Sequence, residues 1–147
     1  MRTWTFQSAG SLIFGRNSID QLPDVARGLG ARRIFVITDA ILAKAGVVEK
    51  VSAKLSAAGI ALDTFHVDKP EPSVEIIRTA TGKAKAFGPD AILGLGGGSN
   101  MDTAKLTALV LAHGGDATEY TGDCRVPGPV TPLICVPTTA GTGAEVS

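Results

Sequence analysis

The chain has 147 residues, and its 14 Lys and Arg are balanced by 14 Asp and Glu, so its formal net charge at neutral pH is zero. With 44% hydrophobic and 19% charged residues, the composition is typical of one folded domain rather than of a disordered protein. A neutral chain has no electrostatic attraction to nucleic acid or to an anionic membrane. No apolar run reaches the roughly 18 residues that cross a bilayer, and the N-terminus lacks the apolar segment of a signal peptide. We therefore expect a cytoplasmic protein with neither a membrane nor a nucleic-acid partner, whose two cysteines, Cys124 and Cys135, are reduced.

The N-terminal residues favour a β-hairpin. Apolar and polar side chains alternate from Thr3 to Gln7, and after a glycine turn a second apolar run extends from Leu12 to Phe14. An outlying hairpin leaves unpaired strand edges, so we expect it to pair with another chain.

From residue 18 onward, helical and strand patterns alternate. Strand patterns lie at residues 32–39, 60–67, 90–95 and 131–136, and helical patterns lie at 18–30, 40–45, 47–58 and 73–87 and after residue 99. This alternation predicts an α/β, Rossmann-like domain, with a mostly parallel sheet, flanking helices and the N-terminal β-hairpin. The chain ends after a glycine-containing loop, where one more helix and strand are expected. We therefore expect residues 1–147 to be a dinucleotide-binding domain that is truncated at its C-terminal end.

A glycine-rich segment follows the third predicted strand. Gly96, Gly97, Gly98 and Ser99 connect that strand directly to a helix. Glycines leave the backbone amides uncovered, and the N-terminus of a helix favours negative charge, so we expect a phosphate or pyrophosphate to bind here. The segment is neither a GxGxxG fingerprint nor a P-loop.

Two charged residues follow in the same helix, and the sequence leaves the role of the first open. Asp102 fits a capping box with Ser99, in which its carboxylate would accept from the backbone of the cap, or it could accept hydrogen bonds from a ribose. Lys105 lies one turn further on and could add positive charge near a pyrophosphate.

Asp39, at the end of the first predicted strand, also has two interpretations. Its carboxylate could accept from an adenosine ribose and repel a 2′-phosphate, which would favour NAD over NADP. It could instead cap the helical segment at residues 40–45.

A polar loop follows the fourth predicted strand. Thr138, Thr139 and Thr142 supply hydroxyls that suit a ribose, a phosphate or a carboxamide, although a polar turn would have a similar sequence. Neither His66 nor His113 has a partner at metal-ligand spacing, so we expect both to be surface or interface residues. No GxSxG sequence indicates a nucleophilic hydrolase.

Two of these segments carry a family resemblance. GGGSNMDTAK at residues 96–105 closely resembles the pyrophosphate signature of the iron-containing (group III) alcohol dehydrogenases, and PTTAGTGAEVS at 137–147 resembles that family's second signature. The strand end Val36–Asp39 matches too, whereas Ala144 stands where many relatives have Ser.

The resemblance implies a metal-dependent dehydrogenase that interconverts alcohols and aldehydes or ketones by hydride transfer to NAD, with NADP as the less favoured cofactor. It implies that residues 96–99 hold the pyrophosphate, that Asp102 and Lys105 lie near the nicotinamide ribose, that the three threonines line the cleft and that Asp39 contacts the adenosine ribose. It also implies a homodimer formed through the N-terminal strands. The iron or zinc ligands would lie in a helical domain beyond residue 147, so this chain would supply no catalytic residue and would be inactive alone.

Two other functions fit the glycine-rich segment. A phosphotransferase of the GGDGS or GGDGT type would use the same loop and helix end, but its loop carries an acid where this chain has Gly98. A non-catalytic nucleotide-binding module would bind the cofactor without any turnover.

Overall fold

The computed structural model describes residues 10–68, 73–122 and 125–146. One parallel sheet contains β1 (Arg33–Asp39), β2 (Ala61–Val67), β3 (Ala91–Gly96) and β4 (Leu133–Pro137). The strand order is β2-β1-β3-β4, so the chain adds β2 on one side of β1 and β3 on the other. The direction of winding therefore changes between β1 and β3. In open α/β sheets, ligands bind outside the carboxyl ends of the strands at such a point.

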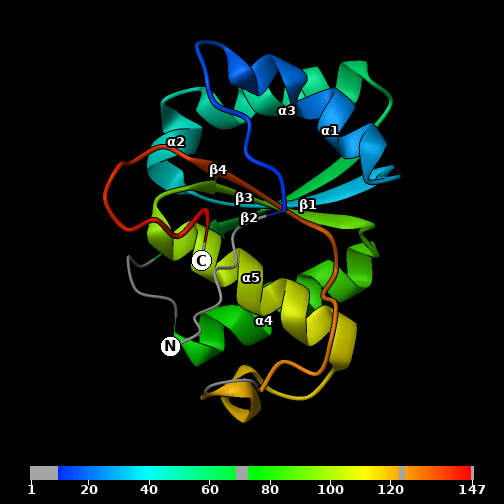
Figure 1. The fold of residues 1–147 in the computed structure, drawn as a ribbon, viewed down its shortest axis with the longest axis vertical. Coiled ribbons are helices and arrows are strands. Elements are labelled where there is room, and N and C mark those ends of the chain that lie inside the picture. Colours follow the sequence, from blue (N-terminus) through cyan, green and yellow to red (C-terminus); the bar gives the residue numbers. More distant parts are fainter. Residues whose placement is uncertain (1–9, 69–72, 123–124, 147) are drawn as a thin grey trace, which may run out of the picture.

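Helices cover both faces of the sheet (Figure 1). One face carries α1 (Leu22–Gly28), α2 (Ala40–Lys44) and α3 (Val47–Ala57), and the other carries α4 (Val74–Phe87) and α5 (Gly98–His113). Two short 3₁₀ helices, η1 (Ser18–Gln21) and η2 (Ala117–Tyr120), precede α1 and follow α5. The expected α/β, Rossmann-like architecture is confirmed.

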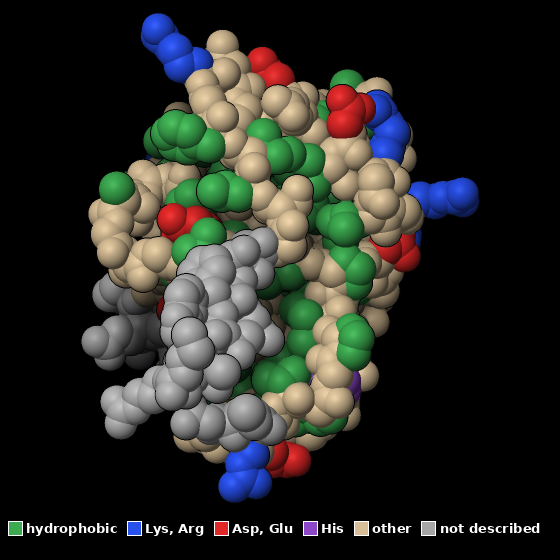
Figure 2. Space-filling model, viewed as in Figure 1, with side chains coloured by type: hydrophobic (Ala, Val, Ile, Leu, Met, Phe, Trp, Pro, Cys, Tyr) green, Lys and Arg blue, Asp and Glu red, His purple; other side chains and the backbone are tan. Residues whose placement is uncertain are grey.

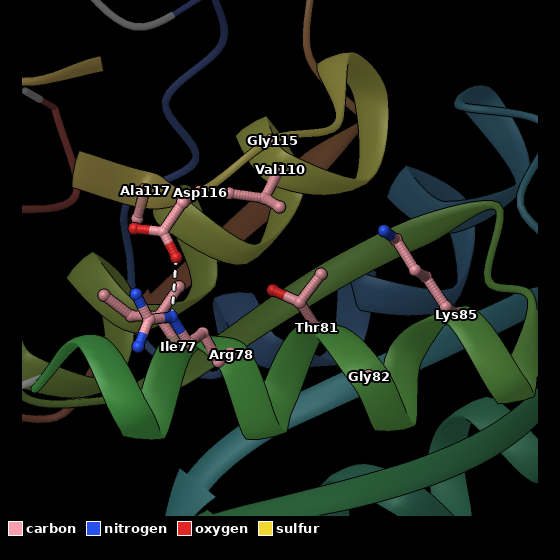
Figure 3. A pocket seen from close by; sticks show the side chains of 9 residues that line it. All are labelled: Ile77, Arg78, Thr81, Gly82, Lys85, Val110, Gly115, Asp116 and Ala117. Carbon is pink, nitrogen blue, oxygen red and sulfur yellow. Dashed lines mark hydrogen bonds and ion pairs between the residues drawn. The ribbon is translucent and has the colours of Figure 1, made fainter. Parts of the chain in front are cut away.

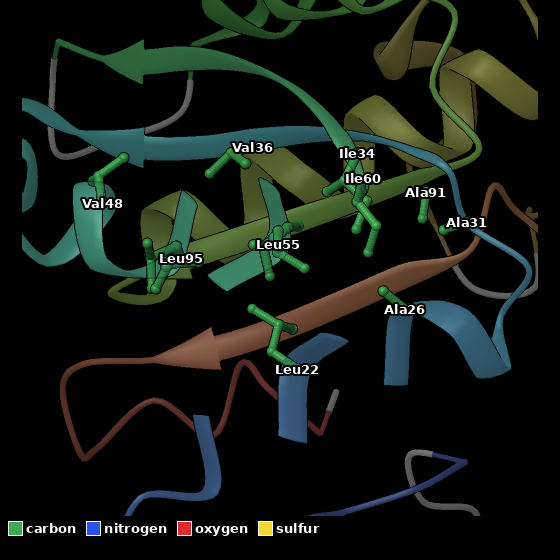
Figure 4. Packing of buried hydrophobic residues seen from close by; sticks show 12 residues of the cluster. Leu22, Ala26, Ala31, Ile34, Val36, Val48, Leu55, Ile60, Ala91 and Leu95 are labelled. Atoms are coloured by element: carbon green, nitrogen blue, oxygen red, sulfur yellow. The ribbon is translucent and has the colours of Figure 1, made fainter. Parts of the chain in front are cut away.

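The uninterrupted apolar run of β1 is explained by burial on both faces. Ile34 and Val36 pack with Leu22 of α1 and Leu55 of α3 in one core, which Figure 4 shows from close by. Phe35 and Ile37, which alternate with those residues along the strand, point to the other face and pack with side chains of α4 and α5. A strand covered on both sides needs no polar alternation.

Residues with known end-of-helix preferences set the helix boundaries. Pro23 lies in the first turn of α1, where its missing amide hydrogen costs nothing, and η1 precedes it as a separate piece. Ser73 caps α4, its hydroxyl accepting from the backbone N–H of Ile76 at 3.3 Å. Gly59 after α3 and Gly88 after α4 have positive φ, as is common after a helix end.

The predicted hairpin is not formed in the part of the chain that the structure describes. Leu12–Phe14 has no regular structure, and the other expected strand, at residues 3–7, lies outside the described residues. Leu12 is 71% exposed and Phe14 is 97% exposed, so these side chains are not packed against the described part of the chain. An isolated two-stranded ribbon is marginal in water, and the apolar pattern of the segment is not sufficient to order it.

Charged side chains are scattered around the face of the molecule shown in Figure 2, and they form no patch of one sign on it. None of the helices in the described ranges combines the length and apolar composition required to cross a lipid bilayer.

Candidate functional site

Three neighbouring strands end at one edge of the sheet and bring the predicted site residues there. Asp39 ends β1, the glycine-rich segment begins at the end of β3, and the threonine loop follows β4. The backbone N–H of Thr138 donates to the carbonyl oxygen of Gly96 at 2.9 Å, which extends the pairing of β3 and β4 into the two loops. The glycine segment therefore lies between the carboxylate on β1 and the threonines after β4.

The glycine segment presents uncovered backbone donors. Gly97 is the N-cap of α5, and its carbonyl oxygen accepts from the amides of Asn100 at 3.1 Å and Met101 at 3.2 Å. The amides of Gly97 and Gly98 have no acceptor among the described residues. Together with the positive end of the dipole of α5, they form a site that favours an anion.

The threonine loop lies directly against these glycines. A Cβ atom on Gly97 would be 3.4 Å from Oγ1 of Thr139, and one on Gly98 would be 3.1 Å from Oγ1 of Thr142. A side chain on either glycine would therefore occupy the space between the backbone amides and the threonine hydroxyls. The structure brings together the glycines and threonines that the sequence predicts as site residues.

The capping box of Ser99 and Asp102, which is one of the two interpretations of Asp102, is wrong. Gly97 caps α5, and Ser99 lies within its first turn, where its carbonyl oxygen accepts from Thr103 Oγ1 at 2.8 Å. The helix starts early because Gly96, with φ of 143°, turns the chain sharply and Gly97 then takes the extended conformation of a cap. Asp102 instead forms an ion pair with Lys105, with 3.3 Å between Oδ1 and Nζ.

The charges of this ion pair act on the neighbouring strand β4. Burial raises the pKa of the Cys135 thiol on β4, and the charges of Lys105 and Asp102 act on the same thiol in opposite directions. A thiol with a raised pKa stays protonated at neutral pH and is a poor nucleophile. Cys135 is a free thiol, and Cys124 lies outside the described residues.

Asp39 acts as a helix cap, as one of its two interpretations predicts. Its Oδ1 accepts from the backbone N–H groups of Ile41 and Leu42, both at 2.9 Å, at the start of α2. A contact of Asp39 with a ribose stays a prediction.

Asn100 is a residue of this site that no sequence motif indicated. Its side-chain amide donates to Asp39 Oδ2 at 2.7 Å and to the carbonyl oxygen of Leu95 at 3.2 Å, joining α5 to the end of β1. Asn100, Ala104 and Ala108 are spaced four residues apart, so Asn100 is the first residue of the helix face that packs on the sheet. A side-chain amide buried on that face needs hydrogen-bond acceptors, and its place in this spacing could have indicated that Asn100 bonds to the sheet.

The described residues do not fit a catalytic metal. Within residues 10–68, 73–122 and 125–146, no three His, Cys, Asp or Glu side chains gather in an arrangement that could hold one. His66 is exposed at the end of β2, and the ring of His113 lies 3.4 Å from the carbonyl oxygen of Gly128.

A hollow of about 180 Å³ lies elsewhere, between α4 and the segment that follows α5 (Figure 3). Arg78 and Asp116 pair at its margin, with 2.6 Å between Nε and Oδ2. The hydrogen bond from Arg78 lowers the pKa of Asp116 to about 2. None of the predicted site residues lines this hollow, and we interpret the pair as structural.

A parallel α/β sheet with a glycine loop and a helix N-terminus at the point where its winding reverses is typical of nucleotide-binding domains. The sequence model of the iron-containing alcohol dehydrogenase family matches residues 9–147 of this chain. This chain therefore belongs to the iron-containing alcohol dehydrogenase family, which confirms the resemblance carried by its two glycine-rich segments.

Individual relatives are similar over nearly the whole chain. It is 38% identical to sulfoacetaldehyde reductase from Bilophila wadsworthia and 33% identical to NAD-dependent methanol dehydrogenase from Bacillus methanolicus, in each case over 92% of this chain. The crystal structure of a 1,3-propanediol oxidoreductase superposes with a TM-score of 0.95 at 31% identity, over 99% of this chain and 38% of that one. The chain spans 35% of the length of the first two relatives.

Proposed function

We propose that this chain binds NAD(H) and is the cofactor-binding portion of a metal-dependent alcohol dehydrogenase. The observation that carries the proposal is the pair of uncovered amides at Gly97 and Gly98, at the N-terminus of α5 and opposite two threonine hydroxyls. A pyrophosphate carries the negative charge that this arrangement favours.

The positions of the flanking residues support a dinucleotide rather than a lone phosphate. Neighbouring strands lie about 5 Å apart, so groups at the ends of β1 and β4 lie on either side of a pyrophosphate held over β3. In this proposal Asp39 contacts the adenosine ribose. The pyrophosphate contacts Gly96, Gly97, Gly98 and Ser99, while Asp102 and Lys105 lie near the nicotinamide ribose. The rest of the cofactor cleft is lined by Thr138, Thr139 and Thr142.

The substrate class follows from the names of the relatives, a reductase of sulfoacetaldehyde and a dehydrogenase of methanol. We propose that the whole enzyme interconverts alcohols and aldehydes or ketones, in which the alcohol carbon gives a hydride to NAD⁺ and its hydroxyl loses a proton. An iron or zinc ion would polarise the substrate oxygen, and its ligands would come from outside the described residues.

Titration calorimetry of the full-length protein with NAD⁺ and with ATP tests the proposal. We expect NAD⁺ to bind and ATP to bind more weakly. Preference for ATP would favour the phosphotransferase that uses a similar glycine loop. A protein that binds NAD⁺ but oxidises no alcohol when loaded with iron or zinc would be a nucleotide-binding module instead.

We also propose that the protein is a cytoplasmic homodimer paired through its N-terminal segment. The exposed apolar side chains of Leu12, Ile13 and Phe14 support this pairing, because a second copy would cover surface that the described part of this chain leaves in water. The free thiol of Cys135 suits a reducing compartment.

A further inference from the structure

We propose that Asn100 is a positioning residue that orients the Asp39 carboxylate toward the adenosine ribose and thereby contributes to the preference for NAD over NADP. This inference rests on the proposed binding of NAD. It starts from the hydrogen bond between the two side chains, whose residues are 61 positions apart in the sequence.

The amide of Asn100 is held in one orientation. Asn100 is 3% exposed, and its Nδ2 group faces two acceptors, Asp39 Oδ2 at 2.7 Å and the carbonyl oxygen of Leu95 at 3.2 Å. The reversed amide would place its oxygen against both acceptors, so the chemistry of the neighbours determines which atom is the nitrogen. Both hydrogens of the amide are therefore committed.

These bonds leave the carboxylate of Asp39 with few free positions at which it can accept a hydrogen bond from a ligand. A carboxylate has about four acceptor positions, two on each oxygen. Two backbone amides of α2 occupy Oδ1, and Asn100 occupies one position of Oδ2. The remaining position on Oδ2 suits one ribose hydroxyl, and the negative charge disfavours a 2′-phosphate at the same place.

Asn100 and the backbone of α2 bind different oxygens of the Asp39 carboxylate. The amides of α2 bind Oδ1 alone, so without Asn100 the other oxygen would lose its only side-chain donor among the described residues. Loss of a hydrogen bond to a charged group costs binding when that group must already be oriented. Asn100 thus acts on the cofactor through Asp39, without a need to touch it.

A comparison of ADP with 2′-deoxy-ADP tests this role, because both carry the pyrophosphate and only ADP carries the 2′-hydroxyl. We expect the full-length wild-type protein to bind ADP more tightly, and Asn100→Ala to reduce this preference by about tenfold, as does Asp39→Ser, which keeps a capping oxygen. A role confined to the stability of α5 would weaken both ligands equally. Thr107→Val is the matched control, a buried polar residue of the same helix, and should keep the wild-type preference.

Since Asn100 is buried, Asn100→Leu is made in parallel. It keeps roughly the size of the side chain and removes the donor without adding a charge or a polar group, so it must also lose the preference for ADP. If Asn100→Ala or Asn100→Leu retains that preference while Asp39→Ser loses it, the positioning role is wrong. A wild-type protein that binds neither NAD⁺ nor ADP would instead overturn the proposed function.

Discussion

The side chain of Asn100 occupies the space that a side chain on Gly96 would need, because a Cβ atom on Gly96 would lie 1.9 Å from Nδ2 of Asn100. The three consecutive glycines therefore serve different contacts. Gly96 leaves room for the amide that holds Asp39, whereas Gly97 and Gly98 leave room beside the threonine loop.

Gly96→Ala should destabilise the protein by about 1–3 kcal/mol, because the new methyl group displaces the amide of Asn100 and φ at this position is 143°. Urea denaturation measures the loss. In an Asn100→Ala background the same substitution should cost less, since the contacts with Nδ2 and Cγ are gone and the backbone strain and a 3.2 Å contact with Cβ remain. An equal cost in both backgrounds would show that the two residues do not compete for space.

Two glycine-to-alanine changes should have opposite effects on stability, because Gly94 of β3 is packed tightly against α5 and a Cβ atom added at Gly82 of α4 would not contact a neighbouring element. A Cβ on Gly94 would lie 2.9 Å from Cβ of Ala104 and 3.1 Å from Cα of Met101, so Gly94→Ala should cost about 1–3 kcal/mol. Gly82 lies inside α4 with open space around it, so Gly82→Ala should stabilise by about 0.5–1 kcal/mol. Thermal unfolding distinguishes them, and a stabilising Gly94→Ala would contradict the packing described.

The sequence predicted those parts of the fold that depend on local patterns. The apolar run of β1 is a short-range signal that formed as expected, and the cap at Asp39 is one of the two roles that the sequence allowed for this residue. The start of α5 was misjudged because a Ser-x-x-Asp pattern fits a capping box equally well at Ser99, and only the backbone angles at Gly96 and Gly97 decide between starts.

The contact between Asn100 and Asp39 could not be obtained from a local pattern. It depends on β1 and β3 being neighbours, which is a property of the strand order. The apolar run at residues 12–14 is a genuine local signal, but it forms no strand in the structure, and a strand also requires a partner. Its pairing with residues 3–7 stays a prediction, because those residues lie outside the described part of the chain.

The ion pair of Asp116 with Arg78 should stabilise the fold only above strongly acidic pH. The pKa of Asp116 lies at about 2, below its usual 3.8, so its charge stabilises the folded state above about pH 4, and this contribution is lost as the pH falls toward 2. The melting temperature of Asp116→Asn should therefore be below that of the wild type at pH 6, and the difference should become small as the pH falls to about 2. A difference that does not vary with pH would contradict this explanation.

The proposed dimer predicts that Phe14→Ser shifts the protein toward a monomer, since Phe14 is the most exposed of the large apolar side chains described. Sedimentation velocity measures the shift. Ile41→Ser is the matched control, because Ile41 is 79% exposed on α2, at a different place in the fold. If the wild type is monomeric, or if Ile41→Ser dissociates the dimer as readily, the N-terminal segment is not the contact.

The central claim is that the amides of Gly97 and Gly98 bind the pyrophosphate of NAD, and calorimetric titration of Gly98→Val with NAD⁺ tests it most directly. Gly98 has an ordinary helical backbone that permits valine, and the Cβ atom of that valine would lie 3.1 Å from Oγ1 of Thr142 and fill the space between the amides and the threonine loop. Gly28→Val, where nothing lies near the added side chain, controls for a general effect of the substitution. We predict that Gly98→Val loses at least about a hundredfold in affinity while Gly28→Val binds like the wild type. Unchanged affinity for NAD⁺ in Gly98→Val would contradict the account.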